Sequence, residues 1–215
     1  MRPCLEFLLA NSSEAGLAPD HHADLRASGL TEETIHRHRL RAVPRGLIGS
    51  LLGFDMPCIR SALLIPFPEP AGGFMDHVRV KVFPALTDRG GHSIKYLQPR
   101  QSGTRLFFPL AEMPEALNGA TPLWLVEGEK KALAVAQLGL PAIGFCGIEG
   151  WHPAGSRELL PDFEHIRLIG RVVELVPDGD WQSNASVARG AFRLAQALES
   201  RGARVRLVIL PPEAG

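Results

Sequence analysis

Three carboxylates stand directly after apolar runs of strand length, where they could hold a divalent cation. Glu127 follows the run PLWLV, and Asp178 and Asp180 follow the run RVVELVP. In open α/β sheets, ligands bind outside the carboxyl ends of the strands. If these two strands are parallel neighbours, the three anions meet at one edge and repel one another unless a cation neutralises them. Hard oxygen ligands suit Mg²⁺ or Mn²⁺. We therefore predict a metal site formed by Glu127, Asp178 and Asp180.

Two glycines accompany these acids. Gly128 follows Glu127, and Gly179 separates the two aspartates. Glycine lets the backbone turn sharply and lets a phosphate approach closely, so we predict that both line the site. The alternative is structural, because a Glu-Gly or Asp-Gly pair at a strand end is often only a turn. Each motif alone leaves this choice open, and their occurrence together in one domain favours the metal site.

The second half of the chain predicts the parallel sheet that would position these acids. Apolar runs at 122–126, 141–145, 171–176 and 204–210 have the length of buried strands. Amphipathic segments at 129–139 and 184–200 predict helices, each followed or ended by a glycine, and a short broken helix is expected around Pro161. Strands that alternate with helices indicate an α/β, Rossmann-like layer with a parallel sheet covered on both faces.

The first half of the chain has a different pattern. Residues 17–46 are polar and helical in character, and Thr31 is a plausible N-cap. Short apolar runs at 61–67, 77–83, 93–97 and 104–108, separated by turn-rich pieces, predict a small and mostly antiparallel sheet. We divide the chain into a helical lead-in at 1–50, a small basic α+β subdomain at 51–118 and the α/β domain at 119–215.

Composition narrows the class of protein. The chain has 215 residues, 45% of them apolar, and a formal net charge of zero. The charges are uneven, because residues 58–110 carry seven basic and three acidic side chains, whereas residues 111–215 carry ten basic and thirteen acidic ones. A basic half beside a metal site suits phosphate binding, although chance also gives such a distribution. No apolar run is long enough for a membrane span or a secretory leader, so we expect a cytoplasmic protein.

Cysteine and histidine give no sign of a structural metal or disulfide framework. Three scattered cysteines without a CxxC pair make a disulfide scaffold or zinc ribbon improbable. Four histidines lie in the polar helical stretch, where surface placement is favoured over metal ligation: His21, His22, His36 and His38.

The motifs resemble a known family. LVEGEKKALAVAQLG, AIGFCG and VPDGD, with the helix and strand that follow, are similar to the TOPRIM domain of DnaG-type bacterial primases, topoisomerases and related nucleases. RSALLIPF, VRVKVF and SIKYLQP resemble the smaller subdomain that precedes TOPRIM in these primases. The resemblance spans about residues 17–211 and is greatest to a primase-like module of phage- and plasmid-borne replication proteins.

The resemblance implies roles for individual residues. Glu127 would act as a general acid/base or a metal ligand, and Asp178 and Asp180 would hold Mg²⁺ or Mn²⁺. Four basic residues would contact single-stranded DNA or incoming nucleoside triphosphates, or else carry ordinary surface charge: Arg60, Arg79, Lys81 and Lys95. A replicative helicase is a further possible partner, since the chain has no phosphate-binding GxxxxGK[ST] loop of its own.

Three functions remain open at this point. The first is nucleotidyl transfer, that is, primer synthesis in the replication of a phage, plasmid or other mobile element. The second is metal-dependent cleavage of nucleic acid by the same carboxylates, and the third is non-catalytic binding of nucleic acid within a replication complex. A topoisomerase is disfavoured because the only tyrosine, Tyr96, lies in the Lys-Tyr-Leu segment and is expected to pack in the core.

Overall fold

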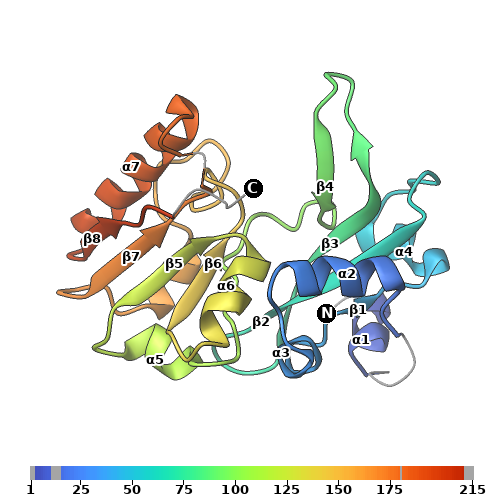
Figure 1. The fold of residues 1–215 in the computed structure, drawn as a ribbon, viewed down its shortest axis with the longest axis horizontal. Coiled ribbons are helices and arrows are strands. Elements are labelled where there is room, and N and C mark those ends of the chain that lie inside the picture. The colour runs from blue at the N-terminus through green and yellow to red at the C-terminus, as the bar shows by residue number, and fades with distance from the viewer. Residues whose placement is uncertain (1–2, 11–15, 180, 211–215) are drawn as a thin grey trace. The chain divides into compact units, whose positions relative to one another are not determined.

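The computed structural model describes residues 3–10, 16–179 and 181–210, which fall into two compact units (Figure 1). The first unit spans Met1–Gly103 and the second spans Thr104–Gly215. The finer three-part division at residues 50 and 118 stays a prediction. None of the described helices has the length and apolar character that crossing a bilayer requires.

The first unit contains a four-stranded antiparallel sheet with helices. Its strands occur in the order β1-β2-β3-β4, and the predicted runs at 61–67, 77–83 and 93–97 lie within three of them. The strands are β1 (Arg41–Ala42), β2 (Ser61–Pro68), β3 (Phe74–Thr87) and β4 (Ser93–Leu97). The helices are α1 (Pro3–Ala10), α2 (Pro19–Ala27), α3 (Glu32–Arg37) and α4 (Arg45–Leu52).

One face of this sheet carries a large apolar cluster of the first unit. Alternate residues of β3 pack with buried leucines of α1 and α4 in one apolar cluster, which includes Leu5, Leu8, Leu51, Leu52, Val78, Val80 and Val82. The predicted cap of α3 is confirmed, because the Thr31 hydroxyl accepts a hydrogen bond from the Thr34 N–H at 3.2 Å.

The predicted surface placement is wrong for two histidines. His21 and His38 are buried, with 0% and 1% of their surface exposed. His21 Nε2 lies 2.7 Å from the Ser61 hydroxyl, and His38 Nδ1 lies 2.8 Å from the Thr34 carbonyl oxygen. A polar helix can bury a histidine when the ring nitrogen finds a partner, and periodicity alone does not reveal that partner.

The second unit confirms the predicted α/β class. Its four strands are parallel and occur in the order β6-β5-β7-β8. They are β5 (Leu123–Glu127), β6 (Ala142–Phe145), β7 (Val172–Val176) and β8 (Arg204–Leu207). The helices are α5 (Met113–Asn118), α6 (Glu129–Ala136), the 3₁₀ helix η1 (Pro161–His165) and α7 (Ala185–Ser200). The last strand is three residues shorter than the predicted run at 204–210.

The segment 104–108 is not the strand of the antiparallel sheet that the sequence predicts. It belongs to the second unit and forms no regular strand, because only Phe107 pairs, in an isolated antiparallel bridge with Gly144 of β6. Asp162 holds the start of this segment through the Arg105 side chain and the Leu106 N–H. Pro109 follows directly and has no N–H to extend a ladder, so the apolar run covers the β6 edge instead of forming a strand.

Helices cover both faces of the parallel sheet. Crossovers between parallel strands are right-handed, so β5-α6-β6 places α6 on one face, whereas the β6–β7 connection and α7 lie on the other. The close approach of Gly190 of α7 to Ile148 of that connection agrees with this placement, since a Cβ on Gly190 would stand 2.7 Å from Ile148 Cγ1. Leu194 and Leu198 of α7 are fully buried, as the predicted apolar stripe requires.

Candidate metal centre at the carboxyl edge of the parallel sheet

The strand order creates a switch point between β5 and β7. The chain passes from β5 to β6 on one side of the sheet and then returns to β7 on the other side of β5. Val126 is paired with Val176, so Glu127 and Asp178 leave the sheet at the same edge. The carboxyl edge at such a switch point is where open α/β sheets bind ligands. Two of the three predicted acids therefore lie at this edge.

Glu127 and Asp178 are in direct contact. The Asp178 N–H donates a hydrogen bond to Glu127 Oε2 at 2.9 Å, which holds the strand-end carboxylate in place. Glu127 is 8% exposed, whereas the Asp178 side chain is half-exposed. Asp180, the third predicted ligand, lies outside the described residues. The edge thus combines one buried carboxylate with one that faces solvent.

Lys131 in the first turn of α6 forms an ion pair with Asp178. Both side chains are about half-exposed, so the pair is open to water and contributes little to stability. The spacing of these residues in the sequence did not indicate this contact. The ion pair matters for function because a cation bound at Asp178 would compete with the ammonium group.

Gly128 has the backbone conformation that its predicted role requires. Its φ is 100°, in the region that L side chains rarely adopt, and its N–H donates to the Phe145 carbonyl at 2.8 Å. This turn starts α6 immediately beside Glu127. At Gly179, an added Cβ would meet no described atom within 4 Å, so close packing does not require a glycine there. The open space is consistent with the predicted approach of a ligand.

A second buried carboxylate at this edge was not predicted. Glu129 is 2% exposed and its Oε1 accepts a hydrogen bond from the Cys146 thiol at 3.0 Å. Cys146 follows the end of β6, the strand that neighbours β5. The only sequence signal was an acid in the first turn of a predicted helix, a position that the helix dipole favours.

The donor atoms at this edge fit a hard divalent cation. Glu127 and Asp178 offer carboxylate oxygens, which Mg²⁺ and Mn²⁺ prefer, and the ion pair with Lys131 demonstrates that the edge attracts positive charge. Within the ranges described, no three histidine, cysteine or acidic side chains gather closely enough to hold a metal ion. Asp180 is the residue that would complete the predicted set.

The four predicted nucleic-acid-binding residues are not gathered in one place. Arg79 and Lys81 are two residues apart in β3 and lie on the same face of the strand. Arg79 Cζ lies 4.6 Å and Lys81 Nζ lies 5.7 Å from the centroid of the Tyr96 ring. Lys95 precedes Tyr96 in β4 and lies on the opposite face of the sheet. Arg60 is exposed and stands just before β2. The structure therefore brings together Arg79 and Lys81 but not the other two.

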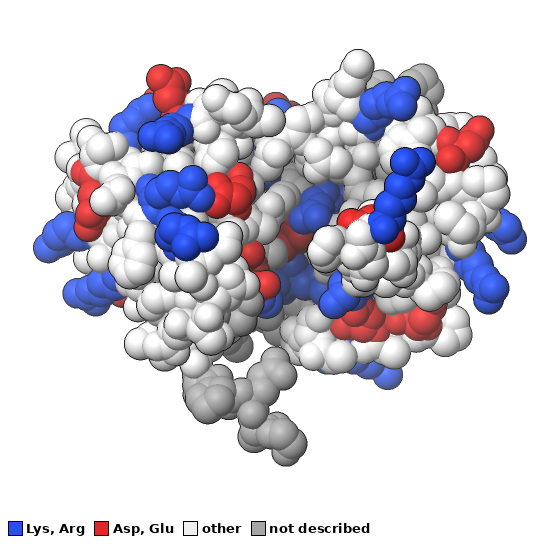
Figure 2. Space-filling model, turned by 90° about the horizontal axis from the view of Figure 1, so that it is seen from above, with Lys and Arg blue, Asp and Glu red and all other residues white. Residues whose placement is uncertain are grey.

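The exposure of Lys81 and of Tyr96 differs from what the sequence suggests. The Lys81 side chain is only 13% exposed and forms an ion pair with Asp24 of α2. Tyr96, expected in the core, is only partly buried and lies beneath the two basic side chains. On the face of the protein seen in Figure 2, basic and acidic side chains are intermingled on the surface.

Part of the chain matches a protein family, and the fold is similar to a solved structure. Residues 116–215 match the family described as Domain of unknown function (DUF3854). A search of curated proteins finds no match. Among solved structures, the crystal structure of the Aquifex aeolicus primase (zinc-binding and RNA polymerase domains) is similar, with a TM-score of 0.63 and 17% sequence identity.

The structural match covers nearly the whole chain. It includes 98% of this chain but 54% of the Aquifex chain, so the protein spans about half the length of that primase structure. The chain has a primase-like fold. At this sequence identity the likeness establishes the fold and not the activity.

Proposed function

We propose that this protein is a primase-like enzyme that transfers nucleotides in a reaction dependent on Mg²⁺ or Mn²⁺. The observation that carries the proposal is the contact between Glu127 and Asp178 at the β5–β7 switch point. A primase-like fold supports it, because the similar structure from Aquifex aeolicus is that of a primase with an RNA polymerase domain. The substrates we propose are single-stranded DNA and nucleoside triphosphates, in the replication of a phage, plasmid or other mobile element.

We assign different roles to the carboxylates according to how exposed each one is. Asp178 is half-exposed and would hold the cation together with Asp180, whereas Glu127 is buried and fixed by the Asp178 N–H. A bound cation would supply charge neutralisation for the phosphates of the substrate. Glu127, held beside it, would complete the coordination or take the proton of the attacking hydroxyl. Gly128 and Gly179 would leave room for the phosphate oxygens.

Arg79 and Lys81 of the first unit are the residues we propose for contact with the nucleic-acid backbone. They share one face of the antiparallel sheet with Tyr96 of β4, which adds an aromatic surface to the two basic side chains. Such a combination of basic and aromatic groups suits single strands, whose bases stack and whose phosphates pair with cations. Arg60 and Lys95 would contribute at most additional charge, since neither belongs to this group.

One observation favours a second candidate, a non-catalytic module that binds nucleic acid. Lys131 already neutralises Asp178, as an ammonium group would in a domain that has lost its metal. Metal binding distinguishes the two. We expect the wild-type protein to bind Mn²⁺ in an isothermal titration, and we expect Glu127→Gln and Asp178→Asn each to weaken binding at least tenfold. Glu199→Gln, at an exposed position near the end of α7, is the matched control and should leave the affinity unchanged.

Activity is tested by incubating the protein with single-stranded DNA, labelled nucleotides and Mn²⁺. Extended products that disappear in Asp178→Asn would support nucleotidyl transfer. Shortened DNA with the same dependence would replace it with a nuclease, and the absence of both products, together with no metal binding, would point to the binding module. Circular dichroism of each variant checks that the fold is retained.

A further inference from the structure

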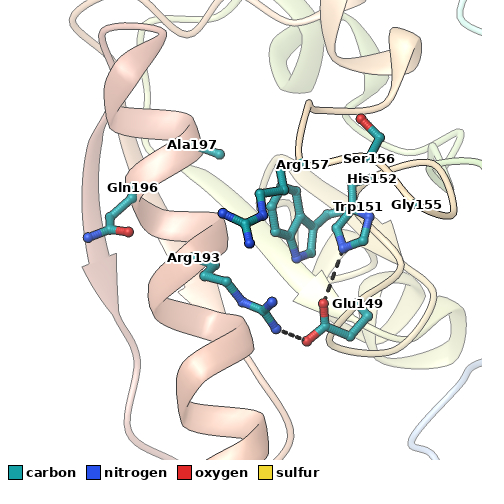
Figure 3. A pocket seen from close by; sticks show the side chains of 9 residues that line it. All are labelled: Glu149, Trp151, His152, Gly155, Ser156, Arg157, Arg193, Gln196 and Ala197. Atoms are coloured by element: carbon teal, nitrogen blue, oxygen red, sulfur yellow. Dashed lines mark hydrogen bonds and ion pairs between the residues drawn. The ribbon is translucent and has the colours of Figure 1, made fainter.

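The second unit contains a pocket that shares no residue with the carboxylate edge. It lies between α7 and the connection that follows β6, and its volume is about 550 Å³ (Figure 3). Arg193 and Gln196 of α7 line one side, and Trp151, His152 and Arg157 line the other. Pockets of about 300–1,000 Å³ are typical of small-molecule sites.

The walls of this pocket are fixed by close packing. Gly190 lets the connection approach α7, since a Cβ there would stand 2.7 Å from Ile148 Cγ1 and 3.1 Å from Glu149 Oε1. Gly150 permits the tight turn between Cys146 and Gly150, since a Cβ on Gly150 would stand 2.1 Å from the Cys146 carbonyl oxygen. Gly190 therefore allows the loop that carries the lining residues to lie close to the helix, and Gly150 allows the tight turn within that loop.

A carboxylate at the pocket wall positions two donors. Glu149 accepts a contact from His152 Nε2 at 3.1 Å through one oxygen and pairs with Arg193 through the other. Figure 3 shows Glu149 between these two side chains. This arrangement leaves Arg193 on the α7 side of the pocket, where Nη2 donates to Glu149 and Nε donates to the Arg189 carbonyl oxygen at 3.4 Å.

Other donors at the pocket have no acceptor. Arg157 is exposed, and neither it nor Gln196 makes a side-chain hydrogen bond or ion pair in the ranges that the structure describes. Trp151 is 3% exposed, and its indole N–H is buried without a partner among the described residues. In Figure 3 the indole nitrogen is on the ring edge that faces Glu149 and Arg193. A buried donor without an acceptor is unfavourable, so an oxygen atom that reached this edge of the ring would form a favourable hydrogen bond with the indole N–H.

We infer that this pocket binds a phosphomonoester of nucleotide size, at a site separate from the metal centre. Arg157 and Arg193 present guanidinium groups from opposite walls, and planar guanidinium groups match phosphate oxygens. The single acidic residue of the lining, Glu149, is already paired with Arg193, which leaves Arg157 uncompensated. The volume exceeds what a bare phosphate needs and accommodates the nucleoside beside Trp151 and Ala197.

The inference is tested on the full chain by recording the indole N–H signals of its three tryptophans by NMR. Each signal is assigned with a Trp→Phe variant, and the protein is titrated with adenosine monophosphate in EDTA, so that the carboxylate edge holds no cation. We expect a saturable shift of the Trp151 signal. We expect no shift with adenosine, and at least tenfold weaker binding of inorganic phosphate.

Matched variants complete the test. Arg157→Gln and Arg193→Gln should each weaken binding of the monophosphate more than tenfold. Arg189→Gln removes the same charge from an exposed position on α7 that does not line the pocket, and it should have no effect. The inference is overturned if the Trp151 signal does not saturate, if inorganic phosphate binds as tightly as the nucleotide, or if Arg189→Gln weakens binding equally. Because the titration excludes metal, failure of the pocket to bind the monophosphate does not contradict the proposed function. Failure of the metal-binding or activity tests likewise does not contradict the pocket.

Discussion

Replacing Lys131 with glutamine should raise the affinity of the carboxylate edge for divalent cations. Lys131 pairs with Asp178, one of the two described residues proposed as ligands, and its ammonium group occupies the space that a cation would share. The two side chains are 51% and 50% exposed, so the pair contributes less than about 1 kcal/mol to folding. The variant should therefore fold like the wild type while its metal affinity changes.

The size of the change follows from Coulomb's law. A unit positive charge about 5 Å from a divalent cation repels it by roughly 1.7 kcal/mol at the dielectric constant of water. Lys131→Gln removes that charge and also the competition for Asp178. The affinity of the edge for the divalent cation should therefore rise about tenfold or slightly more. The pair is open to solvent, so screening reduces the gain at high salt, where the Debye length falls to roughly 3 Å at 1 M.

The assay is a Mn²⁺ titration of the wild type, Lys131→Gln and Lys130→Gln at low and high salt. Lys130→Gln removes the same charge from the neighbouring position and should change the affinity far less. An unchanged or weakened affinity in Lys131→Gln at low salt would refute the reasoning, because it would mean that the ammonium group and the cation do not compete. Equal gains in both lysine variants would mean that only the general charge of α6 matters.

Three further predictions concern stability. Arg171→Met should lower the free energy of unfolding of the second unit by about 3 kcal/mol in urea, because the buried guanidinium donates to the carbonyl oxygens of Glu115, Ala116 and Thr121. Thr31→Ala should cost about 1 kcal/mol in a urea titration, because the α3 cap is lost. Burial lowers the pKa of His38 below its usual 6.5, so the unfolded chain binds the proton first as pH falls. Stability should therefore be complete above about pH 6.5 and decline below it, and His38→Gln should flatten that decline in melts at pH 7.5 and 5.5.

The sequence predicted the parallel sheet well because its signals are local. The apolar runs ending at Val126 and Val176 lie in buried strands, and the glycine at 128 adopts the φ of 100° that only glycine adopts readily. The run at 104–108 shows the limit of such signals. Its apolar residues are buried as expected, but they cover the β6 edge through one bridge, and whether a run pairs fully depends on partners distant in the sequence.

The contact between Glu127 and Asp178 could be predicted from the sequence, whereas the contacts of the basic side chains could not. Strand ends and the switch-point rule suffice to place Glu127 beside Asp178. Nothing in the spacing indicates that Lys131 reaches Asp178 or that Lys81 pairs with Asp24, because both contacts join side chains more than forty residues apart. The pocket beside α7 is hidden for the same reason, since Arg157 and Arg193 come from separate elements.

The topology explains why one small sheet can carry two separate sites. The return of the chain from β6 across β5 to β7 opens the carboxyl edge between β5 and β7, where Glu127 and Asp178 meet. That same return requires a long connection over one face, and the part of it that packs on Gly190 of α7 encloses the second pocket. The two sites are therefore linked through α7 and the connection but use no common side chain. A ligand in the proposed pocket site would influence the proposed metal site by moving one of these elements.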